Sequence, residues 1–595
     1  MNMKAKKSVL LIVLAFLSVL SVLALINYYY DPFGVFDKKD GWYSYRMTRN
    51  PRTAKISYLN RHNKDYNAYV LGSSGSSPLV KESLDKASGK SFYNLFYYGA
   101  DMKDVLDTFN YIVKNYKVDE VLLPITFSFA EEYDKGEDDL HYKMKPELSG
   151  KSSWQFYKDY IFADPLYAND MRRSYKKKTY LPQVYDVFLE ESGNYDKRLR
   201  DIEGIGSRED YLKKYPDFQW KKPALKLKYM KEFFRDLKKV VDTCEEKNIT
   251  YKIFMYPLYK TSYESYDPKE LEEFFRELTK ISDFYDFTYS SISEDPRFFY
   301  DTAHYRNDVG DMMIRKIYGG DGYIAKDFGK LVKKNQVYKI ERPKIESEDQ
   351  KIKVFMLHHI DKDAINAATI TRGKLEELLK LIRDKDYHCL SLGEIRSYVE
   401  DGVDIPQKSV LLTFDDGYLS NYKIVYPLLK KYGLRAVFCP IGSSIGKDTY
   451  KDTGEKIIPH YSLDEIKEMA KSGIIEFASH GYDIHQSEKF EKGQCRPSIL
   501  KLDSETEDQY IAYIKKDFEE FKKLEDVLGY KIRAMAYPLG EHDGLSDVLV
   551  REAGIDQTFT TVEGDSVIIK GLRQSMFALN RINIYEDLDL SVLLK

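Results

Sequence analysis

The sequence predicts an α/β protein in which one N-terminal apolar helix precedes two soluble domains. Three observations predict it. An uncharged run lies near the N-terminus, strand-like runs alternate with helical stretches over residues 66–320, and a closely spaced series of strand signals follows residue 354. A chain of 595 residues is also too long for a single core. We therefore expect a membrane helix, an α/β/α sandwich and a (β/α) barrel, complete or incomplete.

The N-terminal segment has the pattern of a membrane anchor. Three lysines precede an uncharged run from Ser8 to Ile26, and a run of this length just spans a bilayer core with its lysines on the cytoplasmic side. We expect a cytoplasmic tail over residues 1–7 and a transmembrane anchor over residues 8–27, with the rest of this single-pass cell-membrane protein outside the cell. A cleaved signal peptide is the alternative, but the length of the run and the aromatic belt Tyr28–Tyr30 favour the anchor.

The first soluble domain is expected over residues 28–332. Strand-like runs such as Tyr69–Leu71 and Tyr251–Tyr256 alternate with polar helical stretches, which is typical of a parallel sheet covered by helices on both faces. Residues 131–230 are charged and rich in tyrosine, and we expect a helical insertion there. Residues 333–353 have few apolar side chains and are predicted to form the linker.

The second soluble domain is expected over residues 354–595. Its strand signals are VFMLHHI, SVLLTFDDG, RAVFCPIG, IIEFASHG, IRAMAYPLG, QTFTT and ALNRINI. Such strands with intervening helices fit a (β/α) barrel. Composition adds two exclusions. A net charge of −3 gives no case for a nucleic-acid partner, and four cysteines without CxxC spacing indicate neither a disulfide framework nor a cysteine metal site.

Two carboxylates stand where a buried strand meets its loop. The apolar run Ser409–Phe414 is followed by Asp415, Asp416 and Gly417, and chemistry collects at this edge of barrels and open α/β sheets. A simple turn is the alternative, because Asp-Gly pairs are common turn formers.

Two histidines follow another apolar strand in EFASHGYDIHQ, as His480 and His485. Their spacing does not stack them on one helix face, but it suits a loop that bends both imidazoles toward one point. Two imidazoles and one carboxylate form a catalytic metal arrangement, compatible with Zn²⁺ among others. Two unrelated loop histidines are the alternative.

A third motif, RAMAYPLG, contains Arg533 and Tyr537. Together the three motifs, in this order, resemble the NodB-type polysaccharide deacetylases of carbohydrate esterase family 4, over roughly residues 351–595. The histidine spacing and the start MLHHI are most similar to the deacetylases of biofilm poly-N-acetylglucosamine.

This resemblance implies a site and a mechanism. It implies a divalent metal, with Zn²⁺ first and Ni, Co or Fe as alternatives, held by Asp416, His480 and His485. Asp415 would be the general base, Arg533 would pair with it, and the backbone N–H of Tyr537 would stabilise the oxyanion. The family's histidine acid is replaced here by Leu579-Asn580-Arg581, which leaves the acid unassigned between His359, His542 and water at the metal.

The first domain contains a second set of motifs. YVLGSSGSSPL places Ser74 at a strand-to-helix turn, and FFYDTAHYRNDVG contains Asp301 and His304. The pair resembles the SGNH hydrolase superfamily, nearest its membrane-anchored O-acyltransferase-type members. The resemblance implies Ser74 as nucleophile, His304 as base, Asp301 as its orienting partner and Gly99 in the oxyanion hole. The block LLPITFSF lacks the usual asparagine, and a Ser/Gly loop with capping serines is the alternative.

Together these motifs predict a membrane-anchored extracellular modifier of an amino-sugar exopolysaccharide. The barrel would remove N-acetyl groups, and the SGNH-like domain would add or remove O-acyl groups, with a membrane acyltransferase or a polysaccharide synthase as a further partner. The alternatives are a peptidoglycan N-deacetylase with an accessory SGNH domain, and a polysaccharide-binding protein with degenerate sites.

Overall fold

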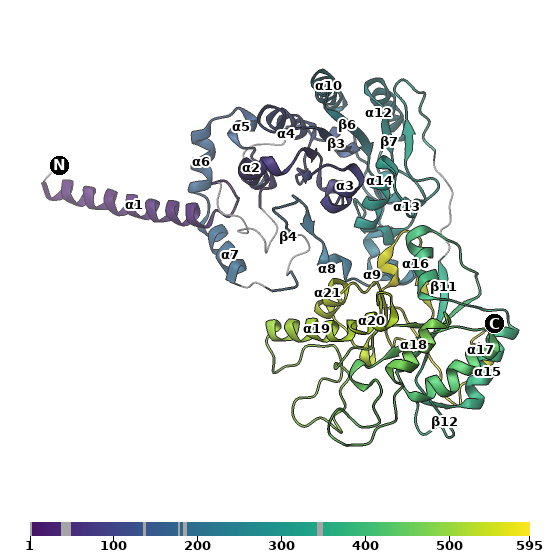
Figure 1. Cartoon of the computed structure of the whole chain (residues 1–595). Helices are drawn as coiled ribbons and strands as arrows, with labels where there is room; N and C mark the ends of the chain where they lie inside the picture. The colour runs from purple at the N-terminus through teal and green to yellow at the C-terminus, as the bar shows by residue number, and fades with distance from the viewer. Residues whose placement is uncertain are drawn as a thin grey trace. The chain divides into compact units, whose positions relative to one another are not determined.

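The chain forms two compact units, shown in a computed structural model (Figure 1). The first comprises Met1–Arg200 and Leu212–Ser347, and the second Asp201–Tyr211 and Glu348–Lys595. Residues 201–211, which the sequence places inside the first domain, thus belong to the second unit. The structure describes residues 3–36, 49–134, 139–176, 179–182, 187–341 and 349–594.

The N-terminal helix α1 spans Met3–Tyr30. Its segment Lys6–Tyr30 contains an 18-residue window with a mean hydropathy of 3.2, and no residue of that window is buried inside the protein. By length and composition α1 is able to cross a membrane, and an N-terminal signal sequence has the same properties. The prediction of an N-terminal apolar helix is therefore confirmed.

The first unit contains a six-stranded sheet in the order β10-β7-β6-β3-β1-β2. The pairings among β1, β2, β3, β6 and β7 are parallel, and β10 pairs antiparallel with β7. The strand bounds are β1 Ala68–Val70, β2 Phe92–Asn94, β3 Glu120–Ile125, β6 Thr250–Met255, β7 Phe284–Asp286 and β10 Lys330–Val332. Every residue of β3 is buried, as expected of a central parallel strand.

The helices of the first unit alternate with these strands. They are α2 Pro51–His62, α3 Lys81–Ser88, α4 Met102–Asn115, α10 Met230–Lys247, α12 Pro268–Ile281 and α14 Asn307–Tyr318. The predicted helical insertion contains short helices and also a hairpin. Its elements are α5 Pro146–Ser149, α6 Ser153–Ile161, α7 Pro165–Lys176, β4 Val187–Phe188, β5 Tyr195–Asp196, α8 Arg198–Asp201, α9 Arg208–Lys214 and η4 Pro216–Gln219.

Seven of the described strands of the second unit form a ring of parallel pairings. They are β11 Gln350–Leu357, β15 Ser409–Asp416, β16 Ala436–Pro440, β17 Ile475–Phe477, β18 Ala534–Ala536, β19 Gln557–Phe559 and β21 Ile582–Asn583. Ladders join β11 to β15, β15 to β16, β16 to β17 and β18 to β19. Single parallel bridges, Ser479 with Met535 and Phe559 with Leu579, continue the ring, and β21 pairs with β11 to close it.

Helices lie between the strands of this ring. They are α15 Arg372–Asp384, α16 Leu392–Asp401, α17 Tyr426–Tyr432, α18 Leu463–Lys471, α19 Glu507–Lys522 and α21 Gly544–Glu552. Strand β11 begins at Gln350, before the predicted Val354, because Gln350–Ile352 first pairs antiparallel with β20 (Ser566–Ile568). Residues 342–348 of the predicted linker lie outside the described residues.

The parallel arrangement brings the ends of several strands to one edge. Asp416 ends β15, His358 follows β11 and His480 follows β17. The interior below this edge is filled by buried apolar side chains, including Val354, Leu411 and Val437. Polar groups at the strand ends therefore meet above a packed core.

Candidate functional site

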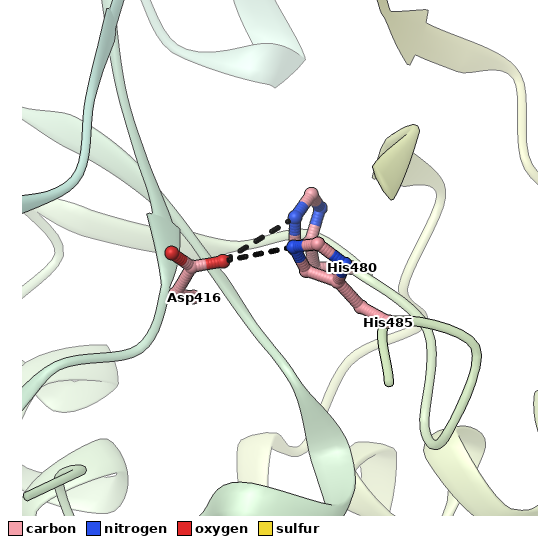
Figure 2. Close-up of side chains that lie close together, drawn as sticks. All are labelled: Asp416, His480 and His485. Atoms are coloured by element: carbon pink, nitrogen blue, oxygen red, sulfur yellow. Dashed lines mark ion pairs between the residues drawn. The ribbon is translucent and has the colours of Figure 1, made fainter. Parts of the chain in front are cut away.

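Asp416 and the two predicted histidines converge in the second unit (Figure 2). Oδ1 of Asp416 lies 3.5 Å from Nε2 of His480 and 3.7 Å from Nε2 of His485. Asp416 has φ +71° and Gly417 has φ +91°, so the chain turns sharply at the end of β15. Aspartate and glycine are among the few residues that accept this backbone region.

Backbone carbonyls fix the orientation of both imidazoles. Nδ1 of His480 donates to the carbonyl of Ala536 at 2.8 Å, and Nδ1 of His485 donates to that of Pro497 at 3.0 Å. Because a carbonyl only accepts, each Nδ1 must carry the hydrogen, which leaves the Nε2 lone pair directed at Asp416. Burial also lowers the pKa of His480 to about 4, so its ring is neutral at physiological pH.

The three residues fit a divalent metal. Oδ1 of Asp416 is buried and has no hydrogen-bond partner among the described residues. It faces two imidazole lone pairs, so the cluster offers acceptors only, which a bound cation would satisfy. Two nitrogens and one carboxylate oxygen suit Zn²⁺ and other first-row metals.

Further contacts hold the loop that carries the two histidines. Asp517 of α19 accepts the backbone N–H groups of Tyr482 at 2.8 Å and Asp483 at 2.6 Å. Both donors lie between the two histidines. The loop is therefore held from α19 even without a metal.

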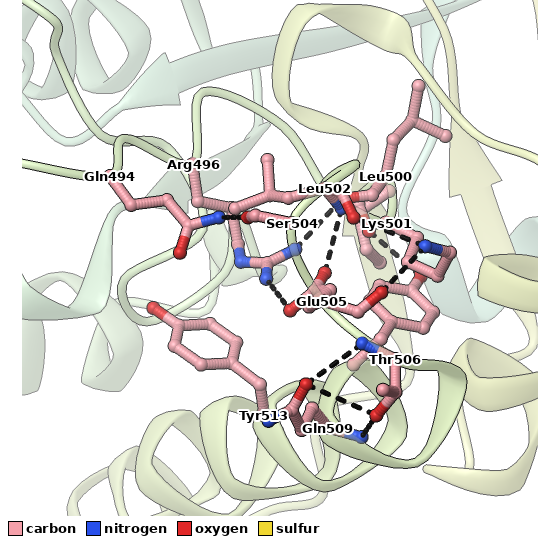
Figure 3. Close-up of polar contacts among 12 residues, drawn as sticks. Gln494, Arg496, Leu500, Lys501, Leu502, Ser504, Glu505, Thr506, Gln509 and Tyr513 are labelled. Atoms are coloured by element: carbon pink, nitrogen blue, oxygen red, sulfur yellow. Dashed lines mark hydrogen bonds and ion pairs between the residues drawn. The ribbon is translucent and has the colours of Figure 1, made fainter.

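Arg496 supports the loop on the other side of His485 (Figure 3). Its backbone exchanges hydrogen bonds with Gln486, and its side chain donates to the carbonyl of Leu500 at 2.8 Å and to Glu505 at 2.6 Å. The buried guanidinium thereby fixes the segment that contains Pro497, whose carbonyl orients His485.

Asp415 pairs with Arg581, not with Arg533. Nη1 of Arg581 lies 2.9 Å from Oδ1 and 2.8 Å from Oδ2 of Asp415, and both side chains are buried. Burial opposes ionisation of Asp415, but Arg581, with smaller contributions from His480 and His358, holds the pKa of the carboxyl below its ordinary value. The carboxylate is therefore ionised and fixed in place.

The predicted ion pair between Arg533 and Asp415 is thus wrong. Arg533 pairs with Asp556, and its side chain is 44% exposed. The reason is strand direction. Arg533 precedes β18, whereas Asp415 lies at the C-terminal end of β15, so parallel strands place the two residues at opposite edges. Arg581 directly precedes β21 and directly follows the run Leu579-Asn580.

The backbone N–H of Tyr537 is also engaged. It donates to the carbonyl of Phe559 at 2.9 Å, because the pairing of β18 with β19 continues one residue past Ala536. This geometry contradicts the expected oxyanion donor. The phenol of Tyr537 donates to Asp547 at 2.6 Å.

A histidine that the sequence analysis did not consider as the acid, His358, lies better placed for that role than His359 or His542. Leu357 is paired with Phe414, so the next residues along the two parallel strands are His358 and Asp415. His359 instead contacts Ser420 Oγ at 2.9 Å and lies 3.5 Å from Asp361.

His542 lies away from this pairing. Its Nδ1 is 3.1 Å from Asp547, and its ring stacks on Tyr537 with centroids 4.7 Å apart. These contacts indicate a packing role for His542.

The first unit brings Ser74, His304 and Asp301 into one chain of contacts. Nε2 of His304 lies 2.9 Å from Ser74 Oγ, and its Nδ1 lies 2.9 Å from both carboxylate oxygens of Asp301. Ser74 opens η2 (Ser74–Ser76) after β1, and β8 (Phe299–Asp301) and β9 (His304–Tyr305) supply the other two. Burial opposes ionisation of Asp301, but its hydrogen bond with His304 lowers the pKa of the carboxyl to about 2. The geometry is that of a nucleophile, a base and an orienting carboxylate.

Gly99 lies in a loop that buried Arg52 holds. The guanidinium of Arg52 donates to the carbonyls of Tyr98 at 3.0 Å and Gly99 at 3.4 Å, and it pairs with Asp104. The carbonyl of Tyr98 and the N–H of Gly99 belong to the same trans peptide and point in opposite directions. Because that carbonyl faces Arg52, the N–H of Gly99 is directed away from Arg52. A bridge between Ser73 and Tyr97 brings this loop beside the serine turn.

Comparison with known proteins identifies the second unit. Residues 402–558 match the family described as polysaccharide deacetylase. The poly-β-1,6-N-acetyl-D-glucosamine N-deacetylase of Escherichia coli K12 is 26% identical over 226 residues, which cover 35% of this chain and 33% of that protein. The enzyme of the same name from Staphylococcus aureus MSSA476 is 27% identical over 199 residues, or 33% of this chain and 62% of that protein. IcaB from Ammonifex degensii has a TM-score of 0.34 and 24% identity over 41% of this chain and 95% of that structure.

Asp416, His480 and His485 thus all lie within the residues that match this family. The second unit contains a polysaccharide deacetylase domain of the NodB type over the residues that this family matches. The match spans about a third of the length of the E. coli relative, and the family match does not extend into the first unit.

Proposed function

We propose that the chain is a metal-dependent N-deacetylase of an extracellular N-acetylhexosamine polymer. One observation carries the proposal: a three-residue metal cluster lies beside a buried carboxylate that an arginine keeps ionised. The relatives named as poly-β-1,6-N-acetyl-D-glucosamine N-deacetylases support that polymer as the substrate.

The residues divide the work of amide hydrolysis. A metal held by Asp416, His480 and His485 would acidify water and polarise the acetamide carbonyl. Asp415 accepts the proton of the attacking water while Arg581 holds its carboxylate in place. The attacking water forms the new C–O bond first, which converts the carbonyl carbon to a tetrahedral adduct. The C–N bond then breaks as the carbonyl re-forms, and His358 donates the proton that the leaving amine requires. The products are acetate and a free amino sugar.

Two alternative functions differ from this proposal. A peptidoglycan N-deacetylase would use the same residues on a different polymer. A polysaccharide-binding protein with degenerate sites would not need two imidazoles aligned by carbonyls on an unpartnered carboxylate oxygen, so the complete cluster favours an enzyme.

The test is acetate release by the full chain, purified with its metal. We expect release from β-1,6-linked N-acetylglucosamine oligomers, little from β-1,4-linked ones or peptidoglycan, and none from Asp415→Asn. If peptidoglycan gave equal or greater acetate release, peptidoglycan would be the substrate instead. If metal-loaded protein released no acetate from any of these three substrates, the proposal of an enzyme would be contradicted.

A second activity is proposed for the first unit: transfer or hydrolysis of O-acyl groups through Ser74. The contacts from Ser74 through His304 to Asp301 favour it. The missing asparagine removes one oxyanion donor, a loss that costs about 3 kcal/mol in other serine enzymes. Transfer from an activated donor, supplied by a membrane acyltransferase or a synthase partner, is therefore favoured over fast hydrolysis.

Mass spectrometry tests this activity. An activated acetyl ester should add one acetyl group to Ser74 in the full chain and in Ser73→Ala, the matched control. Labelling should vanish in Ser74→Ala. Labelling that persists in Ser74→Ala would contradict the assignment and leave the unit as a scaffold.

We also propose that α1 remains attached as a single-pass anchor with both units outside the cell. The apolar segment Lys6–Tyr30 and its preceding lysines support it. A tag after residue 595 should be accessible on intact cells, and the chain should fractionate with membranes. Recovery from the medium of a chain that lacks the apolar segment would favour a signal peptide instead.

A further inference from the structure

A group of exposed apolar side chains lies beside the C-terminal end of α1. Helices α6 and α7 contact α1 and flank this end, with their axes crossing its direction (Figure 1). Trp154 is 78% exposed, Phe162 45% and Leu166 64%. We call these three residues, together with Lys158, the α6–α7 patch. Exposed apolar groups of this kind mark interaction surfaces.

The α6–α7 patch is one face of an amphipathic arrangement. Trp154 and Lys158 lie four residues apart and share one side of α6, and Phe162 follows directly at the C-cap of this helix. The other side supplies Phe156 and Tyr160 to a buried cluster. The core therefore uses one side of α6, and the apolar residues of the other side face outward.

Asn27 sets the height of the patch along α1. The side chain of Asn27 is buried, and its Nδ2 donates to the carbonyls of Ile161 at 3.0 Å and Ala163 at 2.7 Å. These two carbonyls flank Phe162. Asn27 is also the first polar residue after the uncharged run Ser8–Ile26, and Phe162 is therefore tied to the end of that run.

The length of the uncharged run places this end at a membrane surface. At about 1.5 Å per residue the run is about 28 Å long, close to the thickness of the hydrocarbon core. If α1 spans the bilayer, Asn27 and the turn between α6 and α7 lie where hydrocarbon gives way to headgroups. Tyr28 and Tyr29, exposed by 48% and 63%, are residues typical of this zone.

We propose that the α6–α7 patch lies in the headgroup layer of the bilayer that α1 spans, and so attaches the first unit to the membrane at a second place. The inference rests on the proposed anchor. Tryptophan and phenylalanine suit the boundary of a phospholipid surface. The exposed cations Lys158, Arg172 and Arg173 add attraction for anionic headgroups.

This attachment has a mechanical consequence. A unit held by one helix alone could turn about that helix, whereas two helices lying on the surface stop the rotation. The first unit is then held in one orientation toward the bilayer.

Quenching of single tryptophans by brominated lipids tests the inference. The full chain is reconstituted in vesicles whose acyl chains carry bromine. The variant Trp42→Phe/Trp220→Phe retains Trp154, and the matched control Trp42→Phe/Trp154→Phe retains Trp220. Trp220 is similarly exposed, at 59%, but it follows η4, whose Phe218 packs on Tyr259.

We expect Trp154 to lose about half of its emission or more, as buried interfacial tryptophans do, and Trp220 to keep its emission. In vesicles with anionic lipid, Lys158→Glu/Arg172→Glu/Arg173→Glu should weaken the quenching of Trp154. Trp154 that stays unquenched in a chain that floats with the vesicles overturns the inference and leaves the patch for a protein partner. A chain that does not float shows that the anchor itself is wrong, and the inference falls with it.

Discussion

Arg581 holds Asp415 through two short contacts, 2.9 Å and 2.8 Å, from one guanidinium nitrogen in a fully buried setting. Nε of the same arginine donates to the carbonyl of Thr560 at 2.7 Å. The arginine therefore ties the carboxylate to the strand end next to β19, and both the charge and the position of the proposed base depend on it.

Arg581→Met should abolish most deacetylation and lower the free energy of unfolding by about 3 kcal/mol, because it leaves a buried carboxylate unpaired. Arg533→Met is the matched control. It removes a partly exposed pair with Asp556 and should cost less than about 1 kcal/mol with activity retained. Denaturant unfolding and acetate release measure both effects. A greater loss of activity in Arg533→Met than in Arg581→Met would support the pairing of Arg533 with Asp415 that the sequence predicted.

Asp416→Ala, His480→Ala and His485→Ala should each lose the bound metal and all deacetylation, since each removes one of three ligands. Asp415→Asn should keep the metal and lose the rate, because it removes a base and no ligand. Metal analysis of the folded variants separates the two cases. His388→Ala, which breaks a contact with Glu394, serves as a histidine control and should change neither metal content nor rate. Metal loss in Asp415→Asn would mean that the two aspartates are exchanged.

His358→Gln should slow deacetylation of the sugar polymer by about 100-fold or more, the usual effect of losing a general acid. An aryl acetate ester, whose phenolate leaves without being protonated, should lose much less. His359→Gln, next along the chain but bound to Ser420, should affect both substrates weakly. Equal losses on the two substrates would show that His358 has a structural role only.

The loop between His480 and His485 should give the protein a distinct pH dependence. Burial raises the pKa of Asp517 to about 6 from its ordinary value of 3.8. The two hydrogen bonds that its carboxyl accepts from backbone N–H groups lower the pKa, but by less. As the pH rises from about 4 to about 6, the unfolded chain releases this proton while the folded chain retains it, so stability falls by about 3 kcal/mol and is then constant.

Asp517→Asn should remove this decrease, and Asp526→Asn, at an exposed position nearby, should leave it unchanged. Urea unfolding across this pH range measures both. An unchanged decrease in Asp517→Asn would assign the proton to another group.

Local pattern was enough to predict the strands of the ring and the convergence of the three candidate metal ligands. Each strand of the ring is a short apolar run, and Asp416, His480 and His485 directly follow or end such runs, so parallel packing alone brings them together. Ser74 and His304 also meet, although 230 positions separate them. The motifs that the sequence analysis singled out contained both residues.

Pairings that depend on closure of the ring could not be predicted. Arg581 reaches Asp415 across 166 positions because β21 lies beside β11, and nothing in the letters Leu579-Asn580-Arg581 indicates that neighbour. Tyr537 was misassigned for a related reason. Its N–H is taken by a pairing with Phe559 that forms only when β18 and β19 are adjacent.

The segment 201–211 makes the two units inseparable by a single cut. The chain passes from one unit to the other after Arg200, after Tyr211 and after Ser347. Within the second unit the carbonyl of Asp201 accepts from Arg551 at 2.6 Å, and that of Glu203 accepts from Gln574. A protein fragment that starts at residue 349 would lack Asp201 and Glu203, and so would lose both of these hydrogen bonds. A protein fragment that is meant to contain the complete second unit therefore needs two separate pieces of the sequence, residues 201–211 and 348–595.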